Sequence, residues 1–337
     1  MKVALDVRDA HQPPLRGWGR YAAMLERHLP DVCDVVALRE GGAGPEVVFE
    51  QLRFARAAAA AGADVLHAPN CFLPLRRGLP GVVTVHDLAF EEHGDDFSRK
   101  TGAKYRWFVP RAVRSAERVI CVSQFTADDV CARYGVAADK VRVVHNAPAL
   151  AIGNGPPAGG SPYILAVGDL RPKKNLERLV RAWRDADTGR RLVIAGLGSG
   201  PWADVETPGY LPDAELDALL RGADLLVHPS LYEGFGLVVA EAMARGVPVA
   251  CSATTALGEV AGDAAVTFDP LSEDAIGDAL VQALALGEDL GRLGLARAAG
   301  WSWERAARQT ADVYAEVCRH AGGPATTSER RPDGGMG

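Results

Sequence analysis

Short apolar runs alternate with amphipathic stretches along most of the chain. In the first half, a run at residues 3–7 is followed by a turn and then by an amphipathic helix from about 20 to 28. The other strand candidates are 35–38, 65–67, 82–86, 119–122 and 141–144. Strands that alternate with helices are typical of βαβ units, which build a parallel sheet. The pattern therefore predicts a doubly wound α/β domain over residues 1–150.

The second half repeats this architecture without an obvious sequence repeat. Residues 146–162 read NAPALAIGNGPPAGGSP, which is dense in Pro and Gly and has no apolar period, so we expect a linker at 151–161. Strands are then predicted at 163–167, 191–195, 225–228, 247–250 and 265–268. The sequence thus predicts a second doubly wound domain over residues 162–300.

The last apolar pattern of the chain has helical spacing. One face of a helix at 302–320 would carry Trp303, Ala306, Ala307, Thr310, Val313, Tyr314 and Val317. We expect this helix, within 301–321, to close the fold, and crossing back to the N-terminal domain is one way for it to do so. Residues 322–337 have almost no apolar content, which predicts a disordered tail.

Composition narrows the function classes. None of the apolar runs in the 337 residues reaches the roughly 18 residues of a membrane span, and the N-terminus lacks the pattern of a signal peptide. From the missing signal peptide we expect a cytoplasmic location, with a peripheral position at the inner membrane face as an alternative. The six cysteines form no CxxC pair, so we expect reduced thiols. A formal net charge of −6 argues against a nucleic-acid partner and favours small-molecule or glycan chemistry.

The most informative stretch is HPSLYEGFGLVVAEAMARGVPV at 228–249, which predicts a strand, a glycine-containing turn, a helix and a second strand. Such a turn presents backbone N–H groups that suit an anionic diphosphate. Glu233 precedes the turn, and Glu241 lies eight residues after Glu233. If that span were wholly helical, the two carboxylates would lie about 12 Å apart. The carboxylates could therefore hold the two ends of a nucleotide-sugar, or they could be ordinary helix charges.

The same run resembles the E-x7-E signature of glycosyltransferase family 4. The resemblance implies a GT-B fold, in which two Rossmann-like domains face a cleft, with the acceptor bound by the domain at 1–150 and the nucleotide-sugar donor by the domain at 162–300. It implies retaining transfer of a hexose from a nucleotide-diphosphate sugar. It implies that Glu233 contacts hydroxyls of the donor sugar and that Glu241 binds the ribose. The turn that would bind the pyrophosphate comprises Gly234, Phe235, Gly236 and Leu237. Val238 replaces the proline often found after the leucine.

Two further loops of the second half resemble the family. In AVGDLRPKKNL at 166–176, Lys174 matches the lysine that binds the diphosphate, and such a cation would neutralise the leaving group. Asp169 occupies the family's arginine position, so we expect Arg171 to take over that contact, although Arg171 and Lys173 could also be a solvated pair. The loop that would border the base is represented by Gly209, Tyr210 and Leu211.

In the N-terminal half, His86 and Asp87 end a predicted strand on the side where open α/β sheets bind ligands. The resemblance implies that His86 touches the donor sugar, while Asp87 could orient it or bind acceptor. The segment RGWGRY at 16–21 resembles the first loop of a subgroup that includes bacterial mannosyltransferases. That loop implies donor contacts by Gly17 and Gly19, with Trp18 as a stacking surface for an acceptor sugar or a buried anchor.

Three weaker signals concern a dinucleotide cofactor, a metal ion and a membrane surface. GLGSG at 196–200 lacks the full dinucleotide-binding pattern, and Asp185-Ala-Asp187 is a turn, so we expect no cofactor and no metal. The basic, aromatic segment 99–114 could rest on a lipid surface, but packing on its own domain is favoured.

The expected partners are a nucleotide-sugar, with GDP-mannose slightly favoured over UDP- or dTDP-sugars, and a glycan, lipid-linked or small-molecule acceptor. A GT-B epimerase or hydrolase and a non-catalytic sugar-nucleotide sensor are the alternatives.

Overall fold

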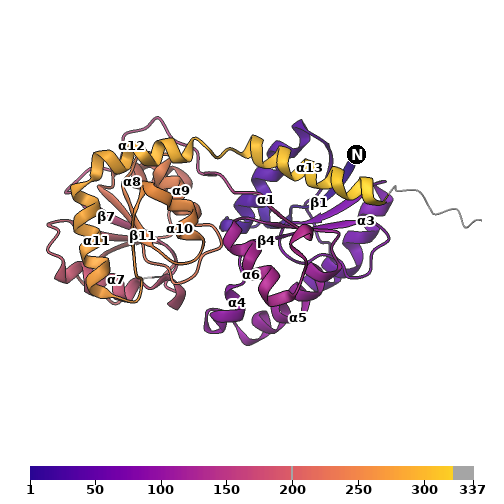
Figure 1. Ribbon diagram of the computed structural model, residues 1–337, viewed down its shortest axis with the longest axis horizontal. Coiled ribbons are helices and arrows are strands. Elements are labelled where there is room, and N and C mark those ends of the chain that lie inside the picture. The colour runs from indigo at the N-terminus through magenta and orange to yellow at the C-terminus, as the bar shows by residue number, and fades with distance from the viewer. Residues whose placement is uncertain (199, 322–337) are drawn as a thin grey trace, which may run out of the picture.

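The computed structural model describes residues 1–198 and 200–321, and the tail expected at 322–337 lies outside this range. The N-terminal half contains one six-stranded parallel sheet (Figure 1). Its strands are β1 (Lys2–Asp6), β2 (Asp34–Leu38), β3 (Val65–Ala68), β4 (Gly81–Val85), β5 (Arg118–Cys121) and β6 (Val141–Val143). They lie in the order β2-β1-β3-β4-β5-β6. The predicted α/β architecture of this half is confirmed.

Helices and short 3-10 turns connect these strands. Helix α1 (Gly17–His28) begins three residues earlier than predicted, and η1 (Arg8–His11) and η2 (Leu29–Asp31) flank it. The remaining helical elements of this half are α2 (Glu46–Val48), η3 (Phe49–Arg53), α3 (Phe54–Ala60), α4 (Ala89–Glu92), η4 (Gly94–Asp96), α5 (Arg99–Ser115), α6 (Gln124–Tyr134) and η5 (Ala138–Lys140).

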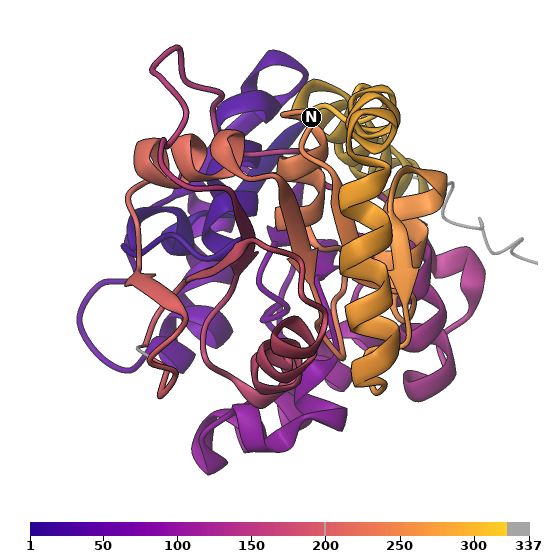
Figure 2. The ribbon, with the colours of Figure 1, turned by 90° about the vertical axis from the view of Figure 1, so that its left-hand side faces the viewer.

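The C-terminal half contains a second six-stranded parallel sheet, in the order β12-β11-β10-β7-β8-β9. Its strands are β7 (Tyr163–Val167), β8 (Arg191–Ala195), β9 (Glu206–Gly209), β10 (Leu225–His228), β11 (Val249–Ser252) and β12 (Val266–Phe268). Its helical elements are η6 (Pro172–Lys174), α7 (Leu176–Asp185), α8 (Asp213–Gly222), α9 (Leu237–Met243), α10 (Ala256–Ala261), η7 (Gly262–Ala264), α11 (Glu273–Ala285) and α12 (Gly287–Ala298). Figure 2 views the molecule with this half in front.

Most of these strands could be predicted from the sequence because both faces of those strands are buried. Every residue of β3, β4, β10 and β11 is buried, as expected for parallel strands covered by helices on both sides. The strand that the sequence did not predict is β9. Its residues Glu206–Gly209 are partly or fully exposed and include a proline, and such a segment forms a strand only at the edge of a sheet.

Two connections join the halves. Residues 144–162 contain no helix or strand, and a second segment leads from α12 to α13 (Trp303–Ala321), which lies on the N-terminal half (Figure 1). There α13 contacts α1, β3 and β5. All seven residues of the predicted apolar face are buried. The Tyr314 hydroxyl lies 2.6 Å from Nδ1 of His67, so this helix also hydrogen-bonds to the N-terminal sheet.

Helix α5 packs on its own half through one face. Tyr105, Val109, Ala112 and Val113 are buried, and Lys104 binds the carboxylates of Glu46 and Glu50 at 3.0 and 2.8 Å. These contacts correspond to the intramolecular packing that the sequence favoured for this segment. None of the described helices is long and apolar enough to cross a membrane.

The strand order creates a switch point in each sheet. In the N-terminal sheet, β2 lies on one side of β1, and the chain then crosses over so that β3 lies on the other side. In the C-terminal sheet, the reversal lies between β7 and β10. Open α/β sheets bind ligands beyond the carboxyl ends of the strands at such points. A cavity of about 750 Å³ is lined by residues that follow these strand ends in both halves.

Candidate functional site

The C-terminal switch point brings Lys174 and Glu233 together. Lys174 ends η6 after β7, and Glu233 lies between β10 and α9, so the chain separates them by 59 residues. Their Nζ and Oε1 atoms are 2.5 Å apart, and both side chains line the cavity. Sheet topology, rather than local spacing, therefore pairs the two residues expected to hold the diphosphate and the donor sugar.

Glu233 is held in its charged form. Burial alone would raise the pKa of this carboxyl, but Lys174, Lys173 and a hydrogen bond from His228 outweigh it and hold the pKa well below the ordinary value. Nε2 of His228 lies 3.2 Å from Oε1 of Glu233 and 3.2 Å from the hydroxyl of Ser230. The sequence did not mark His228 as a site residue, because as the last residue of a buried strand it is indistinguishable from a structural histidine.

The turn after Glu233 lies directly against the N-terminal half. An added Cβ on Gly234 would be 1.6 Å from the carbonyl oxygen of His86, so only glycine fits there. The Ser123 hydroxyl donates to the carbonyl of Gly234 at 2.6 Å, and the Tyr232 hydroxyl donates to Asp129 at 2.7 Å. The structure is therefore closed at this point, with the residues after β4 and β10 in contact.

The other residues of the turn also line the cavity. Phe235 is buried and packs edge-to-face on Trp301, while Gly236 has φ 91° and caps α9, which begins at Leu237. Because α9 begins only there, the span from Glu233 to Glu241 is not wholly helical. The separation of about 12 Å that a continuous helix would give does not apply.

His86 follows β4 and is buried at the same cavity. Its Nε2 lies 2.7 Å from the carbonyl of Pro69, which can only accept a hydrogen bond, so Nε2 carries the proton. Burial lowers the pKa of His86 to about 4, so the ring is neutral at pH 7. Asp87 beside it also lines the cavity, and its Oδ2 lies 3.7 Å from Nζ of Lys173.

Lys173 is not a solvated loop residue. It is only 5% exposed and pairs with Asp87 across the two halves. Burial lowers its pKa, but Asp87 and Glu233 have the larger combined effect, and the pKa lies above its ordinary value. Lys173 therefore adds a second positive charge beside Lys174, which the sequence could not show because its partner lies in the other domain.

Asp169 and Arg171 lie differently relative to the cavity. Arg171 lines it, whereas Asp169 is absent from the lining and accepts a hydrogen bond from the N–H of Leu197 at 3.2 Å. Arg171 and Arg16 approach the Asp169 carboxylate at 3.7 and 3.8 Å. Asp169, at the family's arginine position, therefore attracts one arginine from each side of the cleft. Arg171, which belongs to the same loop as Asp169, reaches the cavity.

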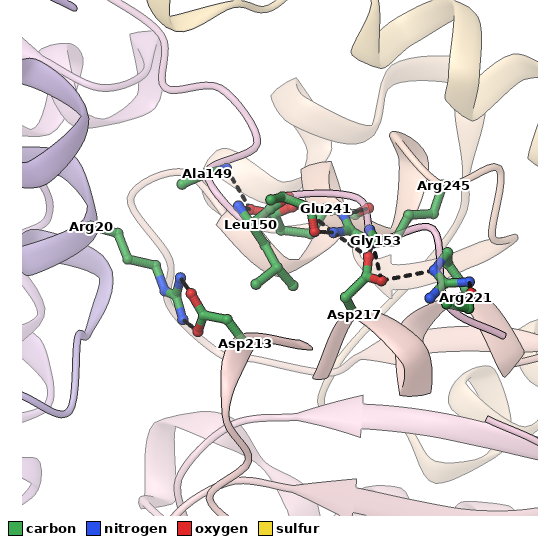
Figure 3. Close-up of polar contacts among 11 residues, drawn as sticks. Arg20, Ala149, Leu150, Gly153, Asp213, Asp217, Arg221, Glu241 and Arg245 are labelled. Carbon is green, nitrogen blue, oxygen red and sulfur yellow. Dashed lines mark hydrogen bonds and ion pairs between the residues drawn. The ribbon is translucent and has the colours of Figure 1, made fainter. Parts of the chain in front are cut away.

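Glu241 lines the cavity but also anchors the linker (Figure 3). Its Oε1 accepts hydrogen bonds from the backbone N–H groups of Ala149 and Leu150 at 2.6 and 2.8 Å, and its Oε2 binds Arg245 at 2.8 Å. Arg245 also binds Asp217, which accepts from the N–H of Gly153 at 3.1 Å. The carboxylate expected at the ribose thus holds the interdomain connection in this structure.

The glycines of the 16–21 segment lie in helix α1 and not in a loop. Gly17 and Gly19 line the cavity, and a Cβ on Gly19 would be 2.6 Å from the carbonyl oxygen of Asp9. Gly19 is therefore required for close packing of α1 on η1. Trp18 is partly buried and lies against two other rings of the cavity, with centroids 6.1 Å from His86 and 5.7 Å from Tyr105.

The loop expected at the base is outside the cavity. Gly209, Tyr210 and Leu211 are absent from the lining, and Tyr210 is 45% exposed. Gly209 ends β9, the strand that the sequence did not predict, which places this loop at the far edge of the sheet. Nearby, Asp213 at the start of α8 binds Arg20 of the N-terminal half at 2.9 and 2.5 Å.

Comparisons with known proteins find relatives that match both halves of the chain. The profile described as Glycosyl transferases group 1 matches residues 153–296, and the one described as Glycosyltransferase Family 4 matches residues 20–148. O-antigen chain mannosyltransferase B of Escherichia coli is 31% identical over 285 residues, which cover 74% of each chain. MMP alpha-(1->4)-mannosyltransferase of Mycolicibacterium hassiacum is 30% identical over 311 residues, covering 80% of this chain and 75% of that protein.

Solved structures share the arrangement of the two halves. Sucrose-phosphate synthase of Thermosynechococcus elongatus superimposes with a TM-score of 0.74 at 20% identity, over 95% of this chain and all of that one. HepE of Anabaena, in complex with UDP and glucose, gives 0.70 at 17% identity, over 94% of this chain and all of that one. The fold is therefore GT-B. The chain belongs to glycosyltransferase family 4, within which it resembles the bacterial mannosyltransferases.

Proposed function

We propose that the protein is a retaining hexosyltransferase that takes its sugar from a nucleotide-diphosphate donor without a metal ion. The observation that carries the proposal is the contact between Lys174 and Glu233 at one switch point, with His86 facing them across the closed cleft. Lys174, Lys173 and Arg171 would supply the positive charge that a departing diphosphate requires. The ionised Glu233 would accept hydrogen bonds from hydroxyls of the donor sugar.

The proposed reaction exchanges one bond at the anomeric carbon for another. The bond from this carbon to the diphosphate oxygen breaks, and a bond to the acceptor oxygen forms on the same face. The acceptor proton passes to the leaving phosphate oxygen. His86 is neutral at pH 7, so its role would be to hold the donor sugar rather than to carry positive charge.

GDP-mannose is the proposed donor, because the two similar relatives described above are named as mannosyltransferases. The similar structure of Anabaena HepE contains UDP and glucose, so a UDP-sugar is the alternative donor. The proposed acceptor is a glycan, a lipid-linked sugar or a small molecule. An epimerase or hydrolase would consume the donor rapidly without an acceptor, and a sensor would bind the donor without turning it over.

A nucleotide-binding screen tests the donor assignment. GDP, UDP, dTDP and ADP and their hexose conjugates are compared by calorimetry, and we expect clear selectivity for one diphosphate. Glu241→Ala should weaken that binding about tenfold or more, because the carboxylate lines the cavity and also holds the linker at Ala149 and Leu150. Glu215→Ala is the matched control, since Glu215 is exposed on α8. Binding that Glu241→Ala leaves unchanged would contradict the assignment.

A further inference from the structure

A second pocket lies where the two connections join the halves, and both connections line it. Its volume is about 270 Å³, and its lining includes His145 of the first connection and Trp301 of the second (Figure 1). Glu259 of α10 and Arg297 of α12 belong to the C-terminal half, whereas Arg305 belongs to α13, which packs on the N-terminal half. We call the pocket lined by these five residues the hinge pocket. A molecule bound in it would contact both halves at once.

The two arginines of the hinge pocket are oriented by backbone carbonyls and retain free donors. Nε and Nη2 of Arg297 donate to the carbonyls of Val260 and Glu259 at 3.0 and 2.5 Å. Nη1 of Arg305 donates to the carbonyl of Gly300 at 3.2 Å. Within residues 1–198 and 200–321, neither guanidinium pairs with a carboxylate, and Nη1 of Arg297 and both other nitrogens of Arg305 make no hydrogen bond. Such N–H donors match the oxygens of a phosphate group.

Glu259 is the one carboxylate among the described lining residues, and it is already bound. Its oxygens accept the backbone N–H groups of Gln124 and Phe125, at 2.9 and 3.0 Å, where helix α6 of the N-terminal half begins. Nε2 of His145 lies 2.8 Å from Oε1. Burial alone would raise the pKa of Glu259, but these hydrogen bonds hold it below its ordinary value. The carboxylate thus serves the contact between the halves, which leaves the arginine charges in excess.

The hinge pocket adjoins the donor site through Phe235. This residue lines the cavity of about 750 Å³ and belongs to the turn expected to bind the pyrophosphate. Its ring packs against two residues of the hinge pocket, with centroids 5.8 Å from Trp301 and 6.2 Å from His145. In the same turn, the carbonyl of Gly234 accepts from the hydroxyl of Ser123, the N-cap of α6. Helix α6 therefore contacts both the diphosphate turn and Glu259 of the hinge pocket.

We propose that the hinge pocket binds a phosphate group through Arg297 and Arg305 and thereby stabilises the closed cleft. Its volume is below the ~300–1,000 Å³ of sites for drug-sized ligands, which suits inorganic phosphate or a small phosphate ester and not a second nucleotide-sugar. Because one arginine comes from each half, the oxyanion would link the halves in the closed arrangement. A ligand that binds this arrangement better raises the affinity for any other ligand that also prefers it. This regulation rests on the proposed transferase function, whereas the phosphate site does not.

The binding test titrates phosphate compounds into protein saturated with the nucleotide diphosphate identified by the screen, so that the donor site is filled. The probes are inorganic phosphate, pyrophosphate and α-D-glucose 1-phosphate, at an ionic strength held constant with sodium chloride. We expect calorimetry to show one further site for at least one probe, with a Kd of about 1 mM or less. Arg305→Ala should raise this Kd about tenfold or more. Arg308→Ala is the matched control, because Arg308 is exposed on the same helix but outside the lining.

The coupling test measures the Kd of the nucleotide diphosphate with and without the probe that binds best. In wild type, the probe should lower this Kd about fivefold. In Arg305→Ala, only competition at the donor site remains, so the probe should leave the Kd unchanged or raise it. Arg297→Ala should behave in the same way, and Arg292→Ala, on the exposed face of α12, should behave like wild type.

Three results would overturn the proposal. They are the lack of a further site for all three probes, a further site that neither Arg297→Ala nor Arg305→Ala weakens, and binding in the hinge pocket that leaves the nucleotide Kd unchanged. Protein that binds none of the nucleotide diphosphates refutes the proposed function instead. In that case the same titration of the unliganded protein, with the same variants, still decides whether the hinge pocket binds phosphate.

Discussion

Replacing Gly234 with alanine is expected to lower kcat/KM for transfer by about a hundredfold or more. The new methyl group would lie 1.6 Å from the His86 carbonyl oxygen and 3.0 Å from Cβ of Asp87, so the contact between the halves could not form as it does here. A displacement of about 1 Å at a reacting centre is enough for a loss of this size. Steady-state kinetics measure the loss, and small-angle X-ray scattering should show a more open molecule.

The control for this variant is Gly78→Ala. Gly78 lies in a loop as Gly234 does, although in the N-terminal half, and an added Cβ there meets no heavy atom within 4 Å. Its activity and scattering profile should match those of wild type. Full activity in Gly234→Ala would show that the closed contact is not the catalytic arrangement.

Replacing Lys174 with alanine should reduce kcat by about 10²- to 10³-fold and change the donor KM much less. Its ammonium lies 2.5 Å from Glu233 and is the group expected to neutralise the departing diphosphate, so its contribution is largest in the transition state. Lys173 remains nearby but is bound to Asp87, which limits compensation.

Single-turnover and steady-state kinetics separate the two effects of this substitution. Lys100→Ala, on the exposed first turn of α5, is the charge-matched control and should retain wild-type kinetics. A Lys174→Ala enzyme whose kcat is unchanged and whose donor KM alone rises would mean that this lysine contributes only ground-state binding.

The strands and the last helix were predictable because their apolar patterns are continuous. Residues 225–228 and 163–167 are buried or nearly so, and the α13 face has regular helical spacing. Gly17 and Gly19 were misplaced in a loop, because glycine has a low helix propensity and the requirement for Gly19 comes from η1, an element earlier in the chain.

Some features of the site were likewise predictable from the sequence, and others were not. The E-x7-E spacing marked Glu233 and Glu241, but no local pattern could show that Glu241 would hold Ala149 and Leu150. Lys173 is buried and pairs with Asp87 of the other half. Such pairings depend on how two domains meet, and a single sequence carries no periodic signal of that contact.

The proposed reaction in the cleft transfers a hexose from a nucleotide-diphosphate sugar with retention and without a metal ion. The direct measurement is NMR of the product formed in the presence of a chelator from GDP-mannose and a panel of acceptors, with UDP-glucose run in parallel. The panel comprises the methyl α-D-pyranosides of mannose, glucose and galactose, and myo-inositol. We predict release of the nucleotide diphosphate and a new glycoside with the α configuration of the donor. A β-linked product, a reaction that stops when the chelator is added, or donor consumption that forms no glycoside would contradict it.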